Sequence, residues 1–161
     1  EGDTVTIGQD SGTVIDVSGH TLGHIAFHFP RSAVMFTGDS LMALGCGRVF
    51  EGTKPQMWVS LQKLAALPSE TIICSGHEYT AANAQFAITV DPGNQSLKSR
   101  IQDIGVAQAA GQYTVPSSLA LELDTNPFLR PEDPSIQAHL GMEGASASDV
   151  FTEIRTRKDN F

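Results

Sequence analysis

The fold is decided by one stretch of sequence, Val34-Met35-Phe36-Thr37-Gly38-Asp39-Ser40. Its first four residues are apolar or β-branched, and such a run predicts a short buried strand. Gly38 then allows the backbone to turn sharply or to approach another group closely. Asp39 follows, at the point where open α/β sheets place their ligands, just beyond the carboxyl end of a strand. On its own, a strand followed by Gly-Asp is more often a turn than an active site.

The segments on either side repeat this arrangement. Thr13–Val17 predicts an upstream strand followed by Gly19-His20, and Thr71–Cys74 predicts a downstream strand followed by Gly76-His77. Three strand ends therefore carry histidine, aspartate and histidine. Imidazole and carboxylate groups that converge from rigid elements are what a divalent metal requires. The sequence therefore predicts a metal site suited to zinc, iron or manganese.

Longer motifs around these residues carry a family resemblance. The strings resembling the metallo-β-lactamase superfamily are Gly19-His20-Thr21-Leu22-Gly23-His24, Thr37-Gly38-Asp39 and Gly76-His77-Glu78-Tyr79-Thr80. Those that resemble glyoxalase II, the hydroxyacylglutathione hydrolase family within it, are Gly45–Thr53, Asn126–Arg130 and Arg155–Phe161. The resemblance covers nearly the whole chain.

The resemblance implies an α/β fold in two parts. Residues 1–77 would form the second half of a metallo-β-lactamase αββα sandwich, and residues 78–161 a helical substrate-binding domain. The residue patterns agree, because they predict strands before Cys74 and none after it. The expected strands, after an edge hairpin in residues 1–12, are Thr13–Val17, Ile25–Phe29, Ala33–Phe36 and Thr71–Cys74. The expected helices begin at Thr53, at a capping Thr80, at Asn94, at Leu119 and after Ser148.

The resemblance also implies the metal chemistry. It assigns His20 to a first metal ion, His77 to a second and Asp39 as the bridge between them, a role suited to a carboxylate with two oxygens. The implied cofactors are two divalent ions, zinc or otherwise iron or manganese. A metal-bound hydroxide would attack the substrate, so no catalytic side chain is expected and Cys46 is not a nucleophile. His24, the second histidine of its motif, is expected to be structural.

The implied substrate is S-D-lactoylglutathione or a similar acylglutathione, and the reaction is thioester hydrolysis, the second step of methylglyoxal detoxification. The residues that match the family's glutathione cleft are Arg48, Phe50, Tyr79, Asn83, Arg155 and Lys158. Phe50 stands where some members have tyrosine, so one hydroxyl contact is expected to be absent. The resemblance makes Leu41–Gly52 one wall of the substrate cleft. The residues alone leave two alternatives open: Leu41–Gly52 as a flexible surface loop, and Arg155 with Lys158 as a solvated helix end.

The family's Thr-His-x-His-x-Asp-His motif does not occur in this sequence. The resemblance places that motif in an N-terminal half, which supplies the remaining ligands, so we expect the chain alone to be inactive. The alternatives are a non-catalytic fragment that binds a glutathione-like ligand or a partner chain, another metallohydrolase of this fold, or a persulfide dioxygenase that uses one iron.

Composition narrows the class of protein. With 161 residues, 40% hydrophobic and 17% charged, the chain is an ordinary globular sequence with one substantial core or two small ones. The net charge of −8 argues against a nucleic-acid partner, and no apolar run approaches the roughly 20 residues that span a bilayer. Two cysteines are too few for a disulfide framework and indicate a reducing compartment. We expect a cytoplasmic monomer, or a mitochondrial-matrix protein if the source is eukaryotic.

Overall fold

The computed structural model describes residues 1–161 and contains a six-stranded sheet with the order β1-β2-β3-β4-β7-β8. The strands are β1 (Thr4–Ile7), β2 (Asp10–Asp16), β3 (Ile25–Phe29), β4 (Val34–Gly38), β7 (Ile72–Ser75) and β8 (Ser117–Ser118). All neighbours pair antiparallel except β4 and β7, which are parallel. The carboxyl ends of β4 and β7 therefore meet at the same edge, as the helical crossover between them predicts.

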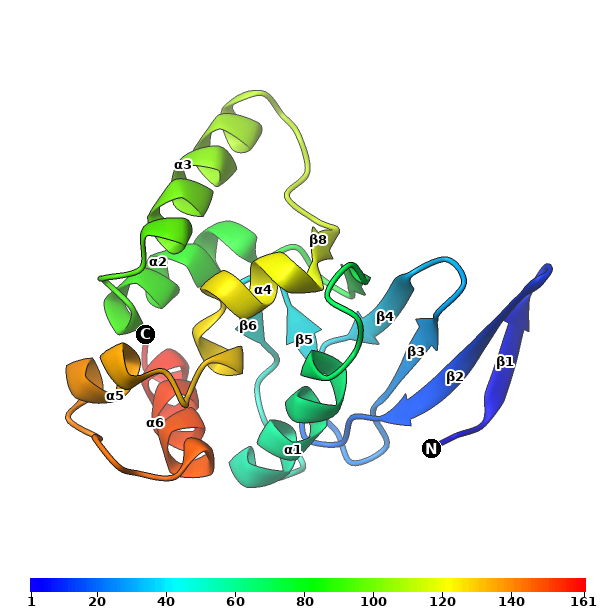
Figure 1. Cartoon of the computed structure of the whole chain (residues 1–161), viewed down its shortest axis with the longest axis horizontal. Coiled ribbons are helices and arrows are strands. Elements are labelled where there is room, and N and C mark those ends of the chain that lie inside the picture. Colours follow the sequence, from blue (N-terminus) through cyan, green and yellow to red (C-terminus); the bar gives the residue numbers. More distant parts are fainter.

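The helices gather at the opposite end of the molecule from β1 (Figure 1). They are α1 (Lys54–Ala65), α2 (Thr80–Val90), α3 (Gln95–Ala109), α4 (Leu119–Thr125), α5 (Pro134–Leu140) and α6 (Ala147–Asp159), with a 3₁₀ turn η1 at Pro127–Leu129. A small hairpin of β5 (Leu41–Met42) and β6 (Gly45–Cys46) lies between the sheet and the helices. None of the helices combines the length and apolarity that a membrane crossing requires.

Helix α1 begins where its sequence predicts. The Thr53 hydroxyl accepts from the Gln56 backbone N–H, and the Gln56 side chain accepts from the Thr53 N–H, which completes a capping box. Pro55 in the first turn costs no hydrogen bond, because the N–H groups there have no helical partner. The buried stripe of α1 covers one face of the sheet and includes Trp58, which packs on Phe151 of α6.

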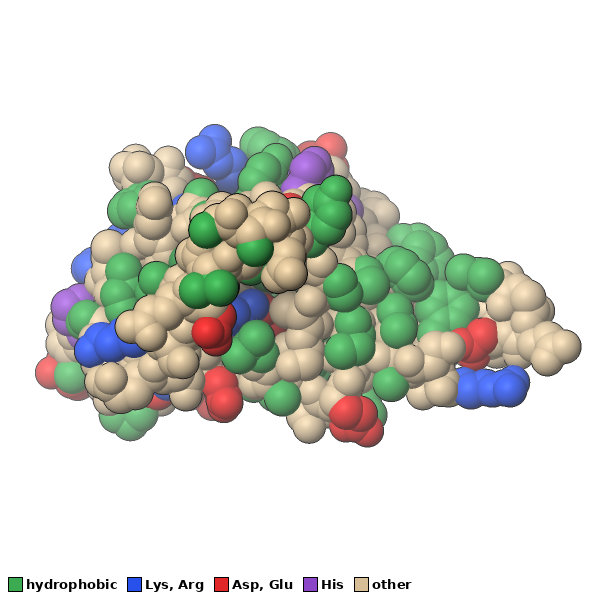
Figure 2. Space-filling view, turned by 90° about the horizontal axis from the view of Figure 1, so that it is seen from above, with side chains coloured by type: hydrophobic (Ala, Val, Ile, Leu, Met, Phe, Trp, Pro, Cys, Tyr) green, Lys and Arg blue, Asp and Glu red, His purple; other side chains and the backbone are tan.

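The other face of the sheet is not covered. Phe27 of β3, Phe36 of β4 and Cys74 of β7 form one cross-strand row on it, and Phe36 is 43% exposed. Ile25 on the same face is 41% exposed. Figure 2 shows hydrophobic side chains gathered over the strand-bearing end of the molecule. A monomeric soluble protein rarely leaves such a patch open, so this face is suited to a partner surface.

Three expectations are corrected by the structure, and one alternative is excluded. A strand does follow Cys74, because Ser117 and Ser118 pair with β7 as β8. Thr80 does not cap α2 but is its first residue, and its hydroxyl has no partner. Helix α6 begins at Ala147, capped by Ser146, rather than after Ser148. The alternative that Leu41–Gly52 is a flexible surface loop is wrong, since most of its first half is buried in β5 and β6.

Candidate active site

Two of the three predicted ligands lie side by side at the meeting edge of β4 and β7. Asp39 directly follows β4, and His77 comes two residues after β7. The Gly76 N–H donates to the Gly38 carbonyl at 2.7 Å, which ties the two strand ends together. As a result, His77 Nδ1 lies 2.7 Å from Asp39 Oδ1. The parallel pairing of the two strands thus converts their sequence patterns into one site.

The third predicted ligand, His20, approaches the other oxygen of the same carboxylate. His20 lies in the loop after β2, and its Nε2 is 3.5 Å from Asp39 Oδ2. Its other ring nitrogen, Nδ1, is 2.7 Å from the Arg48 carbonyl, to which an Nδ1–H donates. That hydrogen bond fixes the ring's orientation and leaves Nε2 with its lone pair, as in metal-binding histidines generally.

His24 supports Asp39 and does not join the ligand group. The Asp39 backbone N–H donates to His24 Nε2 at 3.0 Å. Gly38 is needed beside it, because a Cβ there would lie 2.7 Å from His24 Nε2 and its φ is +52°. The expectation that His24 is structural is therefore confirmed.

The donor set fits a divalent cation but is incomplete within this chain. One carboxylate presents its two oxygens to two imidazoles, which are nitrogen and oxygen ligands typical of zinc, iron or manganese. Glycines let the backbone close around it: a Cβ on Gly76 would lie 2.7 Å from Asp39 Oδ1, and one on Gly47 2.0 Å from the Asp39 carbonyl. No group of three or more histidine, cysteine, aspartate or glutamate side chains is arranged to hold a metal ion by itself. Further ligands would have to come from outside these 161 residues.

The predicted ligands and the predicted substrate residues line one cavity of about 540 Å³. It is formed by the ends of β4 and β7, the loop after β6, and helices α2 and α6. All nine predicted residues line it: His20, Asp39, Arg48, Phe50, His77, Tyr79, Asn83, Arg155 and Lys158. Four further residues line it, Met42, Cys46, Gly47 and Ala82; the first three lie in Leu41–Gly52, expected as a wall of the cleft, and only Ala82 was not anticipated. Cys46 and Gly47 belong to the Gly45–Thr53 motif, so that motif was the available signal for them.

The two cations of α6 differ in their surroundings. Arg155 is only 3% exposed; its guanidinium donates to the Cys46 carbonyl at 2.9 Å and pairs with Asp159. The alternative of a solvated helix end is therefore wrong for Arg155. Lys158 is half-buried, with its ammonium over the rings of Phe86 and Phe161. Burial, together with the positive charges of Arg155 and Arg48, lowers the pKa of Lys158 below its usual range.

Cys46 is not suited to act as a nucleophile, as expected. Burial raises the pKa of its thiol to about 11, despite the nearby charge of Arg155. The thiolate, which is the nucleophilic form, is therefore a minor species near neutral pH.

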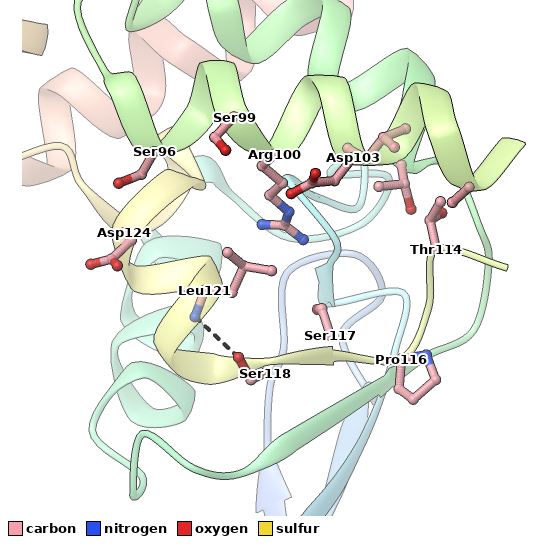
Figure 3. Close-up of a pocket in the computed structure, with 13 residues that line it drawn as sticks. Ser96, Ser99, Arg100, Asp103, Thr114, Pro116, Ser117, Ser118, Leu121 and Asp124 are labelled. Carbon is pink, nitrogen blue, oxygen red and sulfur yellow. Dashed lines mark hydrogen bonds between the residues drawn. The ribbon is translucent and has the colours of Figure 1, made fainter. Parts of the chain in front are cut away.

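A second cavity, of about 510 Å³, lies between α3, β8 and α4 (Figure 3). It is lined by hydroxyls, by Asp103 and Asp124, and by Arg100, and no histidine or cysteine borders it. It is therefore not the predicted metal site.

Comparison with protein families matches both parts of the chain. Residues 78–161 match the model for the hydroxyacylglutathione hydrolase C-terminus, and residues 1–77 match the metallo-beta-lactamase superfamily. The chain belongs to the hydroxyacylglutathione hydrolase family. This confirms the resemblance found in its motifs and the α/β fold class inferred from it.

Curated members of this family are similar over the full chain. Hydroxyacylglutathione hydrolases of Ruegeria pomeroyi and Rhizobium etli are 62% and 54% identical to it over all 161 residues. That of Roseobacter denitrificans is 65% identical over 148 residues, 92% of this chain and 58% of the relative. The chain spans 63% of the length of the first two relatives.

Solved structures of other proteins share the fold. ETHE1 from Myxococcus xanthus matches 99% of this chain and 51% of its own, with 25% identity and a TM-score of 0.61. A protein crystallised in a di-iron-bound form matches 80% of this chain and 46% of its own, with 26% identity and a TM-score of 0.50. The superfamily match and this metal-bound neighbour support the use of divalent metal.

Proposed function

We propose that the full-length protein hydrolyses the thioester of acylglutathiones such as S-D-lactoylglutathione. Water adds its oxygen to the acyl carbon, the carbon–sulfur bond breaks, and the products are the hydroxy acid and glutathione. The observation that carries the proposal is the single cavity in which a histidine–aspartate–histidine group adjoins Arg48, Tyr79 and Lys158. The relatives at 54–65% identity, which are named hydroxyacylglutathione hydrolases, support it.

His20, Asp39 and His77 are the residues of this chain that would hold the metal. Two divalent ions, zinc or otherwise iron or manganese, would supply a Lewis acid and lower the pKa of the attacking water. Asp39 is suited to a position between them, because its two oxygens face two different imidazoles. His24 and the Arg48 carbonyl hold Asp39 and His20 in place through the bonds described above.

The leaving group needs little help from the chain. A thiol has a pKa of about 8.5, so glutathione can depart as a thiolate without a proton from a side chain. The cavity lining offers no free thiol for this step, because the Cys46 thiol is buried and its sulfur accepts a hydrogen bond from the Arg155 guanidinium. The remaining lining residues would then bind and orient the glutathione tripeptide.

Glutathione is anionic, and the cavity offers cations and an aromatic surface to it. Arg48 and Lys158 line the same cavity as the predicted metal ligands, and Tyr79 stacks on His77 at 5.1 Å between ring centroids. We assign the glycyl and glutamyl carboxylates to Arg48 and Lys158, because charge-assisted hydrogen bonds are the strongest that these side chains make. The acyl end of the substrate would then reach Asp39.

The part of the relatives that this chain does not span completes the proposal. It would supply the missing metal ligands and would cover the exposed sheet face that carries Phe36. The active protein is then a monomer that contains both parts in one chain.

The test is a metal titration of the full-length gene product. We expect about two equivalents of divalent metal per chain, loss of S-D-lactoylglutathione hydrolysis on chelation, and recovery when metal is restored. Full activity with at most one equivalent would refute the two-metal site. Full activity without metal would refute the proposal itself, and glutathione binding without turnover by the loaded protein would favour the non-catalytic alternative.

A further inference from the structure

The β5–β6 hairpin contributes Met42 and Cys46 to the lining of the cavity, and the turn between its strands is buried. Met42, Ala43, Leu44 and Cys46 are each at most 7% exposed and Gly45 is buried too, so their backbone polar groups cannot reach water. The two-residue loop, Ala43-Leu44, leaves several of these groups without partners inside the hairpin. Buried backbone groups in native proteins are almost always hydrogen-bonded, so the partners must come from elsewhere.

Side chains of the helical half of the chain, residues 78–161, supply these partners. Five hydrogen bonds reach backbone groups of residues 42–46. Asn126 Nδ2 donates to the Met42 carbonyl at 3.2 Å and to the Gly45 carbonyl at 3.1 Å, and Asn83 Nδ2 donates to the Ala43 carbonyl at 3.0 Å. The Leu44 N–H donates to Glu122 Oε2 at 2.8 Å, and Arg155 donates to the Cys46 carbonyl at 2.9 Å. The turn is thus held by residues 40 to 109 positions away in the sequence.

Asn126 is the central member of this group. It is fully buried, and its amide nitrogen also lies 3.1 Å from Glu122 Oε2. Glu122 is fully buried as well, and Arg100 balances its charge. Figure 3 shows Arg100 extending from α3 at the back of the second cavity. The amide N–H groups of Asn126 therefore face two carbonyl oxygens and a carboxylate. An acceptor in their place would be repelled by these three groups.

The turn is also strained in a way that needs external support. Leu44 has a φ of +56°, in the left-handed region that non-glycine residues rarely adopt. Its side chain is fully buried in a small apolar cluster with Ala84, Leu97 and Ile104 of the helical half. The helical half therefore holds both the backbone and the side chain of the turn.

The turn leads directly into the backbone that contacts the metal-ligand group. The Gly47 N–H donates to the Ser40 carbonyl at 3.1 Å, and the Arg48 carbonyl binds His20 Nδ1. Gly47 packs so closely on the Asp39 carbonyl that a Cβ would not fit. A shift of the turn would therefore move the groups that orient His20 and Asp39.

We propose that Asn126 is a positioning residue for the metal ligands, acting through the 42–46 turn. It fixes the turn, the turn places Gly47 and Arg48, and these two hold Asp39 and the His20 ring. This proposal rests on the proposed function for the metal itself, but it concerns a residue that lines neither the cavity nor the metal group. Groups that orient metal ligands typically change metal affinity by about 10- to 100-fold when they are lost.

The test is zinc affinity in the full-length gene product, measured on metal-free protein by competition with a chromogenic chelator. Asn126→Asp has nearly the same shape but replaces the donor with a carboxylate beside Glu122. We expect its zinc dissociation constant to rise at least tenfold, with KM for the acylglutathione at saturating zinc changed less than twofold. Asn94→Ala is the matched control, because it removes the α3 cap and two side-chain bonds of the helical half without touching the turn. Its zinc dissociation constant should stay within twofold of wild type.

The outcomes separate the two proposals. A folded Asn126→Asp with wild-type zinc affinity, or an equal loss in Asn94→Ala, would overturn the positioning role and leave the proposed function intact. Absence of zinc binding in the wild type would instead overturn the proposed function, and this proposal with it. If Asn126→Asp does not fold, Asn126→Ser, whose hydroxyl can serve one carbonyl only, decides: a severalfold weaker zinc affinity supports the role and an unchanged one refutes it.

Discussion

At the residue scale, one helix places two cations three positions apart in different roles. Arg155 is buried and bonded to the Cys46 carbonyl, so it supports the wall of the cavity. Lys158 keeps only a long bond, 3.3 Å, to the Ala82 carbonyl and otherwise lies over aromatic rings. Its ammonium is therefore the freer of the two to bind a substrate carboxylate.

Removal of the Lys158 ammonium should weaken substrate capture. A hydrogen bond to a charged group contributes about 1.5–3 kcal/mol, and about 1.4 kcal/mol is a factor of ten, so Lys158→Ala should raise KM for S-D-lactoylglutathione about ten- to a hundredfold. The change in kcat should be small, because the reacting carbon lies at the other end of the substrate. Steady-state kinetics on this substrate and on a small thioester without the tripeptide provide the measurement. Equal losses on both substrates would mean that Lys158 supports the fold instead.

The lowered pKa of Lys158 predicts a pH effect. Burial and the charges of Arg155 and Arg48 penalise the protonated form in the folded protein. The ammonium is therefore lost at a lower pH than in an ordinary lysine, and KM should begin to rise on the alkaline side below pH 10.5. Stability responds differently from substrate binding. Because the folded protein loses this proton before the unfolded chain does, the free energy of unfolding increases as pH rises through the lowered pKa. Lys158→Arg, which stays charged, should remove the rise in KM, and an unchanged profile would contradict the assignment.

At the scale of elements, helix α6 shows how a cap sets a boundary. The Ser146 hydroxyl accepts from the Asp149 N–H, and it also donates to the Asp149 carboxylate. Ser148, two residues later, is inside the first turn. Helix boundaries read from sequence are uncertain where several serines precede the apolar stripe, and residues 146–148 are such a case.

The cap assignment can be measured directly. Ser146→Ala should lower the free energy of unfolding by about 1 kcal/mol, since it removes the acceptor for a first-turn N–H. Ser148→Ala should leave it unchanged or raise it by a few tenths of a kcal/mol, because alanine is the better helix former. Urea unfolding of the two variants distinguishes them, and the reverse order would show that the helix begins later.

The residues of the candidate site were easier to predict from sequence than the strand and the hydrogen bonds that hold them in place. The three predicted ligands follow strands with clear apolar patterns, and the parallel pair β4 and β7 brings two of the strand ends together, so the grouping of His20, Asp39 and His77 could be predicted from local signals. Strand β8 could not, because two serines form no pattern and pair only through the tertiary edge of β7. The bonds from Asn126 to the β5–β6 turn join residues 81 and 84 positions apart, and no periodicity predicts such contacts.

At the scale of the molecule, the uncovered sheet face and the length of the relatives agree. The chain spans 63% of those relatives, and it leaves an apolar row at Phe36 open to solvent. The three predicted ligands lie at an edge of the same sheet, and by themselves they do not make a metal site. The missing ligands and the cover of the sheet are therefore expected from the same source.

A charge on the open sheet face tests this expectation in the full-length gene product. If the face is covered there, Phe36→Asp should reduce the free energy of unfolding by at least the roughly 3–5 kcal/mol typical of losing a buried phenylalanine. Val106→Asp on α3 is the control, because Val106 is 70% exposed and lies among the helices. Its effect should be within about 0.5 kcal/mol, as for most surface changes. Equal stability of Phe36→Asp and wild type would show that the face stays open.

The central claim is that Asp39 holds the metal that drives acylglutathione hydrolysis. The most direct test is the turnover of S-D-lactoylglutathione by the full-length Asp39→Asn variant at limiting metal. The amide keeps one oxygen and the shape of the side chain but loses the negative charge between His20 and His77. We predict that turnover falls by orders of magnitude while the circular dichroism spectrum and the unfolding midpoint stay close to wild type. Wild-type turnover at limiting metal would contradict the account.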